Sequence, residues 1–118
     1  MQISIFMSSL KKNYCVEGVY TFDKVIVKRG GKISSSFSDA IRGGNAAKKV
    51  RQDKMFVSDD YVLLQDCYFD SLSTAAQFVS GSSLDGYICW KIDTKKHSKS
   101  IGTYLEENGL RNNNKRNL

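Results

Sequence analysis

The first part of the chain alternates apolar and polar side chains in the manner of a half-buried β-sheet. Residues 2–5 alternate strictly, and the stretch from Val16 to Val27 is rich in β-branched residues, which favour extended backbone. A polar break at residues 22–24 divides that stretch, so we expect two strands joined by a turn. The pattern predicts an antiparallel meander.

The middle of the chain is interrupted by glycine and serine. Residues 30–45 contain two glycine pairs and three consecutive serines, a composition typical of turns and irregular backbone. We expect a long surface connection here, with room for one short helix at residues 37–42. Asn45 can cap a helix that runs from Ala46 to about Lys54, and residues 61–64 are strand-like.

The clearest helix lies before Gly81, where Leu72, Ala75, Ala76 and Val79 recur at helical spacing. Ser71 or Ser73 can cap its start, and Gly81 supplies the left-handed residue that ends it. A turn signal at residues 85–86 follows. It separates this helix from the last apolar segment.

That last segment, residues 87–92, alternates like a strand. The alternation predicts that Trp90 enters the core. Tyr87 and Lys91 then share the outer face, where Tyr87 is the better candidate for stacking on a base. A short helix is expected around residues 104–110.

These elements predict a single α+β domain at residues 1–110, with a small, mostly antiparallel sheet and two or three short helices. A chain of 118 residues with 41% hydrophobic residues is sufficient for one packed core. The asparagine-rich basic tail at residues 111–118 has nothing to bury, so we expect it to be disordered.

The composition also predicts where the protein resides. No stretch approaches the roughly 20 apolar residues that span a bilayer, and residues 1–10 lack the pattern of a signal peptide. The chain should therefore stay where it is made, away from membranes. The odd number of widely spaced cysteines indicates a reducing, cytoplasmic environment. We expect all three to be small buried side chains, namely Cys15, Cys67 and Cys89.

Catalytic and metal sites find little support. The single histidine, His97, lies in a polar, lysine-rich run and is interpreted as an exposed loop residue. Zinc sites need about four ligands at recognisable spacing. The acidic pairs at residues 59–60 and 106–107 are placed in a turn or on a helix surface, so no nucleophile, base and orienting group come together. We expect no enzymatic activity, no metal and no cofactor.

Charge is distributed unevenly along the chain. Residues 1–54 carry eleven basic and four acidic side chains, a balance of +7. Residues 55–93 carry one lysine and six aspartates (−5), and residues 94–118 carry six basic and two acidic side chains (+4). This polarity favours a polyanion such as nucleic acid, although charge alone supports only non-specific attraction.

Several basic and polar residues are candidate contacts, each with a structural alternative. The Lys28–Lys32 segment is either a phosphate-contacting loop or an ordinary charged hairpin end, and it lacks the spacing of a nucleotide-binding loop. The helix at residues 46–54 presents either a contact surface or a solvated face. Ser71 and Ser73 either hold a phosphate or only cap their helix. The candidate nucleic-acid contacts are Lys28, Arg29, Lys32, Lys48, Lys49, Arg51, Ser71, Ser73, Tyr87 and Lys91.

The second half of the chain also carries a recognisable series of motifs: Phe69, Ser71-Leu72-Ser73, Ala75-Ala76, Gly81, Asp85-Gly86-Tyr87 and Trp90-Lys91. This order resembles the domain of unknown function 4357 family, an accessory domain of GIY-YIG nucleases and restriction-modification proteins, which is similar to RAMA domains. The similarity extends over roughly residues 16–107. Leu72, Asp85 and Tyr87 stand where the family has proline, asparagine and tryptophan, and no GIY-YIG nuclease core is visible.

The resemblance implies a non-catalytic accessory module that binds DNA and senses methylated adenine in a restriction, defence or mobile-element context. The alternative is a protein-interaction module that docks on a nuclease, methylase or restriction complex, because the acidic central segment suits a basic partner. A small antitoxin-like oligomer is a third hypothesis.

Overall fold

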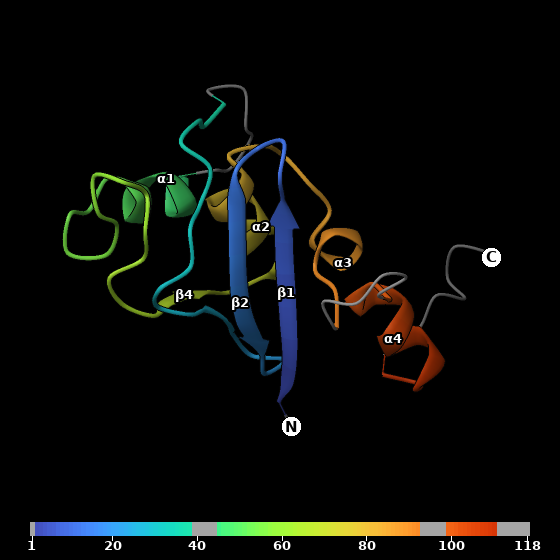
Figure 1. The fold of residues 1–118 in the computed structure, drawn as a ribbon. Helices are drawn as coiled ribbons and strands as arrows, with labels where there is room; N and C mark the ends of the chain where they lie inside the picture. Colours follow the sequence, from blue (N-terminus) through green and yellow to red (C-terminus); the bar gives the residue numbers. More distant parts are fainter. Residues whose placement is uncertain (1, 39–44, 93–98, 111–118) are drawn as a thin grey trace.

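The computed structural model describes residues 2–38, 45–92 and 99–110, which form one antiparallel sheet with helices packed against it (Figure 1). The sheet order follows the chain: β1 (Ile3–Ser9), β2 (Tyr14–Tyr20), β3 (Val25–Val27) and β4 (Cys67–Phe69). The helices are α1 (Asn45–Arg51), α2 (Leu72–Ser80), α3 (Gly86–Cys89) and α4 (Ile101–Glu107). The predicted single α+β domain with an antiparallel sheet is confirmed.

The N-terminal meander is also confirmed. β1 and β2 pair along their whole length, from Ile3 opposite Tyr20 to Ser9 opposite Tyr14. The predicted turn between β2 and β3 is closed by Thr21, whose hydroxyl accepts a hydrogen bond from the Lys24 amide at 3.0 Å. Phe22 adopts a left-handed conformation there, with φ of 73°.

The Lys28–Lys32 segment is not a hairpin end, because it continues along β2 inside the sheet. The Lys28 amide donates to the Glu17 carbonyl at 2.8 Å, and Lys32 forms an antiparallel bridge with Cys15. Between them Gly30 takes φ of 90°, outside the range that other residues favour. The glycines thus allow an irregularity in the middle of the sheet while pairing continues on both sides.

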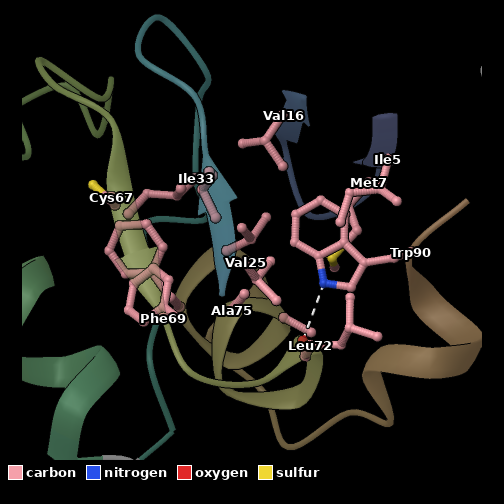
Figure 2. Close-up of a cluster of buried hydrophobic side chains, with 14 of the residues drawn as sticks. Ile5, Met7, Val16, Val25, Ile33, Cys67, Phe69, Leu72, Ala75 and Trp90 are labelled. Carbon is pink, nitrogen blue, oxygen red and sulfur yellow. Dashed lines mark hydrogen bonds between the residues drawn. The ribbon is translucent and has the colours of Figure 1, made fainter. Parts of the chain in front are cut away.

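One face of the sheet forms the hydrophobic core (Figure 2). Alternation along each strand sends Ile5, Val16, Val25 and Phe69 to this face, where α2 packs against β2, β3 and β4. Trp90 is fully buried among them, as predicted, and its indole N–H donates to the Leu72 carbonyl at 3.0 Å. That bond satisfies a polar group that would otherwise be buried unpaired.

Residues 87–92 do not form the predicted strand. The Asp85 carboxylate accepts from the Tyr87 amide at 2.9 Å and caps the short helix α3, which begins at Gly86. Ile88 is consequently 62% exposed while Trp90 is buried, so the two do not share a face. Only Lys91 retains a sheet contact, as an isolated bridge to Phe6 at the edge of β1.

The middle of the chain needs smaller corrections. α1 ends at Arg51 rather than near Lys54, and residues 61–64 contribute only isolated bridges. The fourth strand is β4, which was not predicted, because three residues are too few to show an alternation. The helices at residues 72–80 and near the C-terminus are confirmed as α2 and α4.

The predictions for the cysteines hold in part. Cys67 is buried, Cys89 is partly buried and Cys15 is exposed on β2, so the expectation that all three are buried is wrong for Cys15. Cys15 alternates with the buried Val16 and therefore points away from the core. The predicted helix at residues 37–42, the tail at residues 111–118 and His97 lie wholly or mostly outside the described residues.

Candidate nucleic-acid interface

The second face of the sheet is open in the part of the chain that the structure describes. In the view of Figure 1, α2 lies behind β1 and β2, and the opposite face is turned toward the reader. The outward-pointing side chains of the strands are all exposed or half-exposed. We call them the open sheet face: Ser4, Phe6, Ser8, Cys15, Glu17, Val19, Ile26 and Tyr68.

Three predicted lysines border this face, two from the Lys28–Lys32 segment and one, Lys91, from a distant part of the sequence. Lys91 pairs with Phe6 through two backbone hydrogen bonds of 2.8 and 2.9 Å, and Phe6 is opposite Glu17. Lys28 follows in the same row, with its amine 3.1 Å from the Glu17 carboxylate. Lys32 bridges Cys15 one row further on. Paired residues point to the same side of a sheet, so the three lysines border one surface. The Lys28 amine is paired there with the Glu17 carboxylate, and the Lys91 amine donates to the Ile88 carbonyl at 2.9 Å.

The irregularity after β3 hollows this surface. A cavity of about 440 Å³ is lined by Phe6, Cys15, Val16, Glu17 and residues 28–31. The Arg29 amide donates to the Asp66 carboxylate at 2.8 Å, which holds the backbone in place. Its guanidinium has no ion-pair partner within the described residues. The Lys28–Lys32 segment thus presents cations beside an aromatic ring.

Apolar side chains form a second row across the same face. Val19 is opposite Ile26, and Ile26 is opposite Tyr68. The Tyr68 side chain is 61% exposed. An exposed aromatic ring on an open sheet can stack on a nucleic-acid base. Tyr68 is not predictable from the sequence because β4 has too few residues to show an alternation, and Phe6 is not because its pairing with Lys91 is not visible in the sequence.

The lysines of α1 lie apart from this surface. Lys48 and Lys49 are exposed on a helix that packs against α2, on the covered side of the sheet. Neither lysine has an ion-pair partner among the described residues. The predicted cations therefore form two groups on different sides of the domain, one at the open sheet face and one on α1.

Arg51 is half-buried and holds three segments together. Its guanidinium donates to the carbonyls of Phe78 and Ser34, and to that of Ser36 at 3.1 Å. The guanidinium also lies 5.1 Å from the centre of the Phe37 ring, a cation–π distance. Burial lowers the pKa of Arg51, although a guanidinium stays charged at neutral pH. Arg51 is engaged in the fold rather than presented to a partner.

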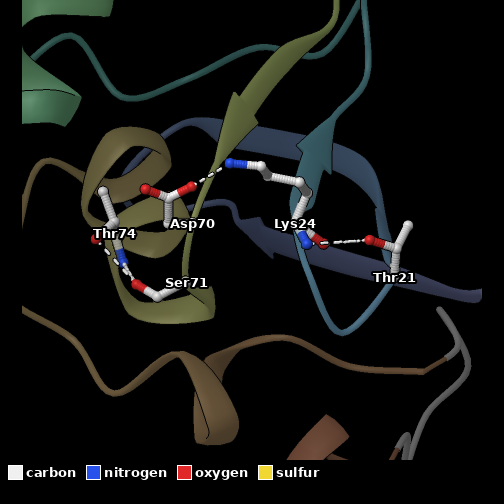
Figure 3. Close-up of polar contacts among 5 residues, drawn as sticks. All are labelled: Thr21, Lys24, Asp70, Ser71 and Thr74. Atoms are coloured by element: carbon white, nitrogen blue, oxygen red, sulfur yellow. Dashed lines mark hydrogen bonds and ion pairs between the residues drawn. The ribbon is translucent and has the colours of Figure 1, made fainter.

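The two serines at the start of α2 act within the fold as well. Ser71 accepts a hydrogen bond from the Thr74 amide at 3.1 Å, the geometry of a helix N-cap (Figure 3). Ser73 accepts from the Gly86 amide at 3.0 Å and so links α2 to α3. The neighbouring Asp70 pairs with Lys24 across the strand ends. Tyr87 is half-buried in α3 and packs against the hydrophobic core.

Other classes of site were sought among the same residues. No group of three metal-ligating side chains comes together in the described ranges. None of the helices built from those ranges is both long and apolar enough to cross a membrane.

By its fold the chain is a small α+β domain with an antiparallel sheet covered on one face. It belongs to the family described as a domain of unknown function, DUF4357, which matches residues 6–102. No curated protein and no solved structure matches the chain. The family resemblance inferred from the motifs between Phe69 and Lys91 is thereby confirmed.

Proposed function

We propose that this protein is a non-catalytic accessory module that binds DNA through the open sheet face. The observation that carries the proposal is the convergence of Lys28, Lys32 and Lys91 beside Phe6 on one uncovered face. Phe6, the Lys28–Lys32 segment and Lys91 are far apart in sequence, and the fold brings them together. Cations beside exposed rings are the combination that single-stranded nucleic-acid surfaces use.

The expected energetics follow from these groups. Three lysine–phosphate contacts give a slope of about −2 for the logarithm of affinity against the logarithm of salt concentration on single strands, and about −3 on duplex. Stacking of a base on Phe6 or Tyr68 contributes roughly 1–3 kcal/mol each. Glu17 opposes part of the phosphate attraction, so moderate affinity is expected.

The biological setting is part of the same proposal. An accessory domain of a GIY-YIG nuclease or restriction-modification system, similar to RAMA domains and acting in the cytoplasm, would recognise modified DNA such as methylated adenine. This setting is what the resemblance of the motifs between Phe69 and Lys91 implies. The hollow beside Phe6 offers a place where a base can be distinguished by its shape.

Fluorescence anisotropy with labelled single-stranded, double-stranded and adenine-methylated DNA tests the proposal. We expect salt-dependent binding that weakens at least fivefold in the variant Lys28→Gln/Lys32→Gln. The matched control is Lys48→Gln/Lys49→Gln, which removes the same charge from α1 and should change affinity less than twofold. Equal weakening in both variants would show that the protein attracts DNA only through its overall positive charge. Absence of DNA binding at low salt would refute the proposal.

A second candidate function, docking on a protein partner, has its own observation. Met55, Leu64 and Tyr68 are 69%, 46% and 61% exposed. The Leu64 amide bonds to the Phe56 carbonyl at 2.8 Å, and Leu64 and Tyr68 line one hollow together with Asp66 and Arg29. Exposed apolar side chains with a carboxylate nearby suit an apolar and basic surface on a nuclease or methylase subunit.

Isolation of the protein from its native host separates the two functions. A stoichiometric partner that survives nuclease treatment and is lost with Met55→Ser/Leu64→Ser supports docking. If the same partner is retained by that variant and lost with Lys28→Gln/Lys32→Gln, the apolar patch is not the docking surface.

A further inference from the structure

A second polar cavity lies at the tip of the β1–β2 hairpin, apart from the open sheet face. Its volume is about 520 Å³, and three separate segments form its walls. The hairpin tip supplies Lys11, Lys12 and Asn13. The connection between β3 and α1 supplies residues 34–38, and the end of α2 supplies residues 80–82. We call it the serine pocket, because six of these residues are serine.

The positive charge of the serine pocket is not neutralised by its walls. The Lys12 amine donates to the Ser82 hydroxyl at 2.9 Å, which directs this cation toward the end of α2. Lys11 has no hydrogen-bond or ion-pair partner among the described residues. No acidic side chain is among the described residues that line the cavity. One ammonium group therefore contacts a serine hydroxyl of the pocket, and a second lysine lines the same cavity, without a carboxylate among the described lining residues.

The end of α2 does not cancel this charge. The last carbonyls of a helix normally carry partial negative charge, but here donors cover three of them. The Gln77 carbonyl accepts from the Gly81 amide at 2.8 Å, and the Val79 carbonyl accepts from the Ser34 amide at 2.8 Å. The Phe78 carbonyl accepts from the Arg51 guanidinium, which adds a third cation next to the pocket.

We propose that the serine pocket binds a phosphoryl group, carried either by a free nucleotide or by the phosphorylated end of a nucleic-acid strand. Ammonium groups are standard donors to phosphate oxygens, and serine hydroxyls add to them. Ser80 is an exception among the six serines, because its hydroxyl donates to the Ala76 carbonyl at 2.8 Å. The volume lies within the roughly 300–1,000 Å³ range of small-molecule sites, which leaves room for a sugar beside the phosphate. The open sheet face shares no lining residue with the pocket, so this site stands whether or not the sheet binds DNA.

Nuclear magnetic resonance of the isotopically labelled full chain tests the site, with inorganic phosphate titrated at constant ionic strength against chloride. We expect saturable shifts at the amides of residues 34–38 and 80–82. They should weaken at least fivefold in Lys11→Gln/Lys12→Gln and persist in Lys48→Gln/Lys49→Gln. Absence of saturable shifts, or equal weakening in both variants, would overturn the proposal.

Two further titrations identify the source of the phosphoryl group. Tighter binding of adenosine monophosphate than of a 5′-phosphorylated oligonucleotide assigns a free nucleotide. The reverse order, with no shift at these amides from a 5′-hydroxyl oligonucleotide, assigns a strand end. If 5′-phosphorylated and 5′-hydroxyl strands shift them equally, the site does not read a terminal phosphate. The variant Lys28→Gln/Lys32→Gln should leave all shifts in the serine pocket unchanged. The proposal that the open sheet face binds DNA can therefore fail without affecting the result for the serine pocket.

Discussion

Replacement of Arg51 by methionine should destabilise the fold rather than act on a binding surface. The substitution keeps a long apolar stem but removes the guanidinium that bonds to carbonyls of Ser34, Ser36 and Phe78. Those carbonyls belong to α2 and to the connection that packs beside it. They would lose their charged donor in a half-buried position, where unpaired carbonyls are costly.

The magnitude can be worked from these contacts. A hydrogen bond from a charged donor contributes about 1.5–3 kcal/mol, and contributions within one network are not additive. The cation–π contact with Phe37 adds about 0.5–1 kcal/mol. Partial exposure of Arg51 reduces the sum, so we expect a loss of about 2–4 kcal/mol. For a domain of this size the melting temperature should fall by roughly 10 °C.

Urea unfolding followed by the fluorescence of Trp90, the single tryptophan, measures this loss. Lys48→Met on the same helix is the matched control, because it removes an exposed cation and should change stability by less than about 0.5 kcal/mol. Equal stability of the two variants, with DNA binding lost only in Arg51→Met, would refute the structural role and restore Arg51 as a contact residue.

Three further predictions concern stability. Gly81→Ala should cost at least about 2 kcal/mol in thermal unfolding, because φ is 73° and a Cβ would lie 1.8 Å from the Ser36 carbonyl oxygen; Gly109→Ala, with φ of 69° but open space, should cost clearly less. Gln77→Met should stabilise by about 1 kcal/mol in urea, because the buried Gln77 side-chain oxygen has no partner among the described residues; a loss of stability would reveal a missed partner. Burial raises the pKa of Cys67 from 9.0 to about 12, so the folded state favours the neutral thiol. Stability should be complete below pH 9 and fall by up to about 1.4 kcal/mol per pH unit from 9 toward 12. A decline of the same steepness in Cys67→Ala would contradict this assignment.

Local patterns in the sequence were sufficient for the elements that form through near neighbours. The meander follows from alternation, and α2 follows from helical spacing bounded by the Ser71 cap and Gly81. Trp90 was placed in the core correctly although its strand was wrong. A large apolar ring with one polar atom has few other places in a domain of this size.

Features that depend on long-range contacts were not predictable. β4 has only three residues and is a strand because it pairs with β3. The wrong prediction at residues 87–92 has a local cause instead, because the Asp85 side chain caps α3 where the alternation of residues favours a strand. Arg51 resembles the exposed lysines of α1 in the sequence, yet its position faces backbone carbonyls. The open sheet face was likewise not predictable, because Phe6 and Lys91 are paired neighbours in the fold but lie far apart in the sequence.

The most direct test of the account is to map DNA contacts on the labelled full chain by nuclear magnetic resonance. The account predicts the largest shifts on the open sheet face, around Phe6, Glu17, Lys28, Lys32 and Tyr68, with much smaller shifts on α1. These shifts should disappear in Lys28→Gln/Lys32→Gln, while the spectrum of that variant remains typical of a folded protein. Shifts confined to α1, or no shifts at low salt, would contradict the claim that this face is the DNA-binding surface.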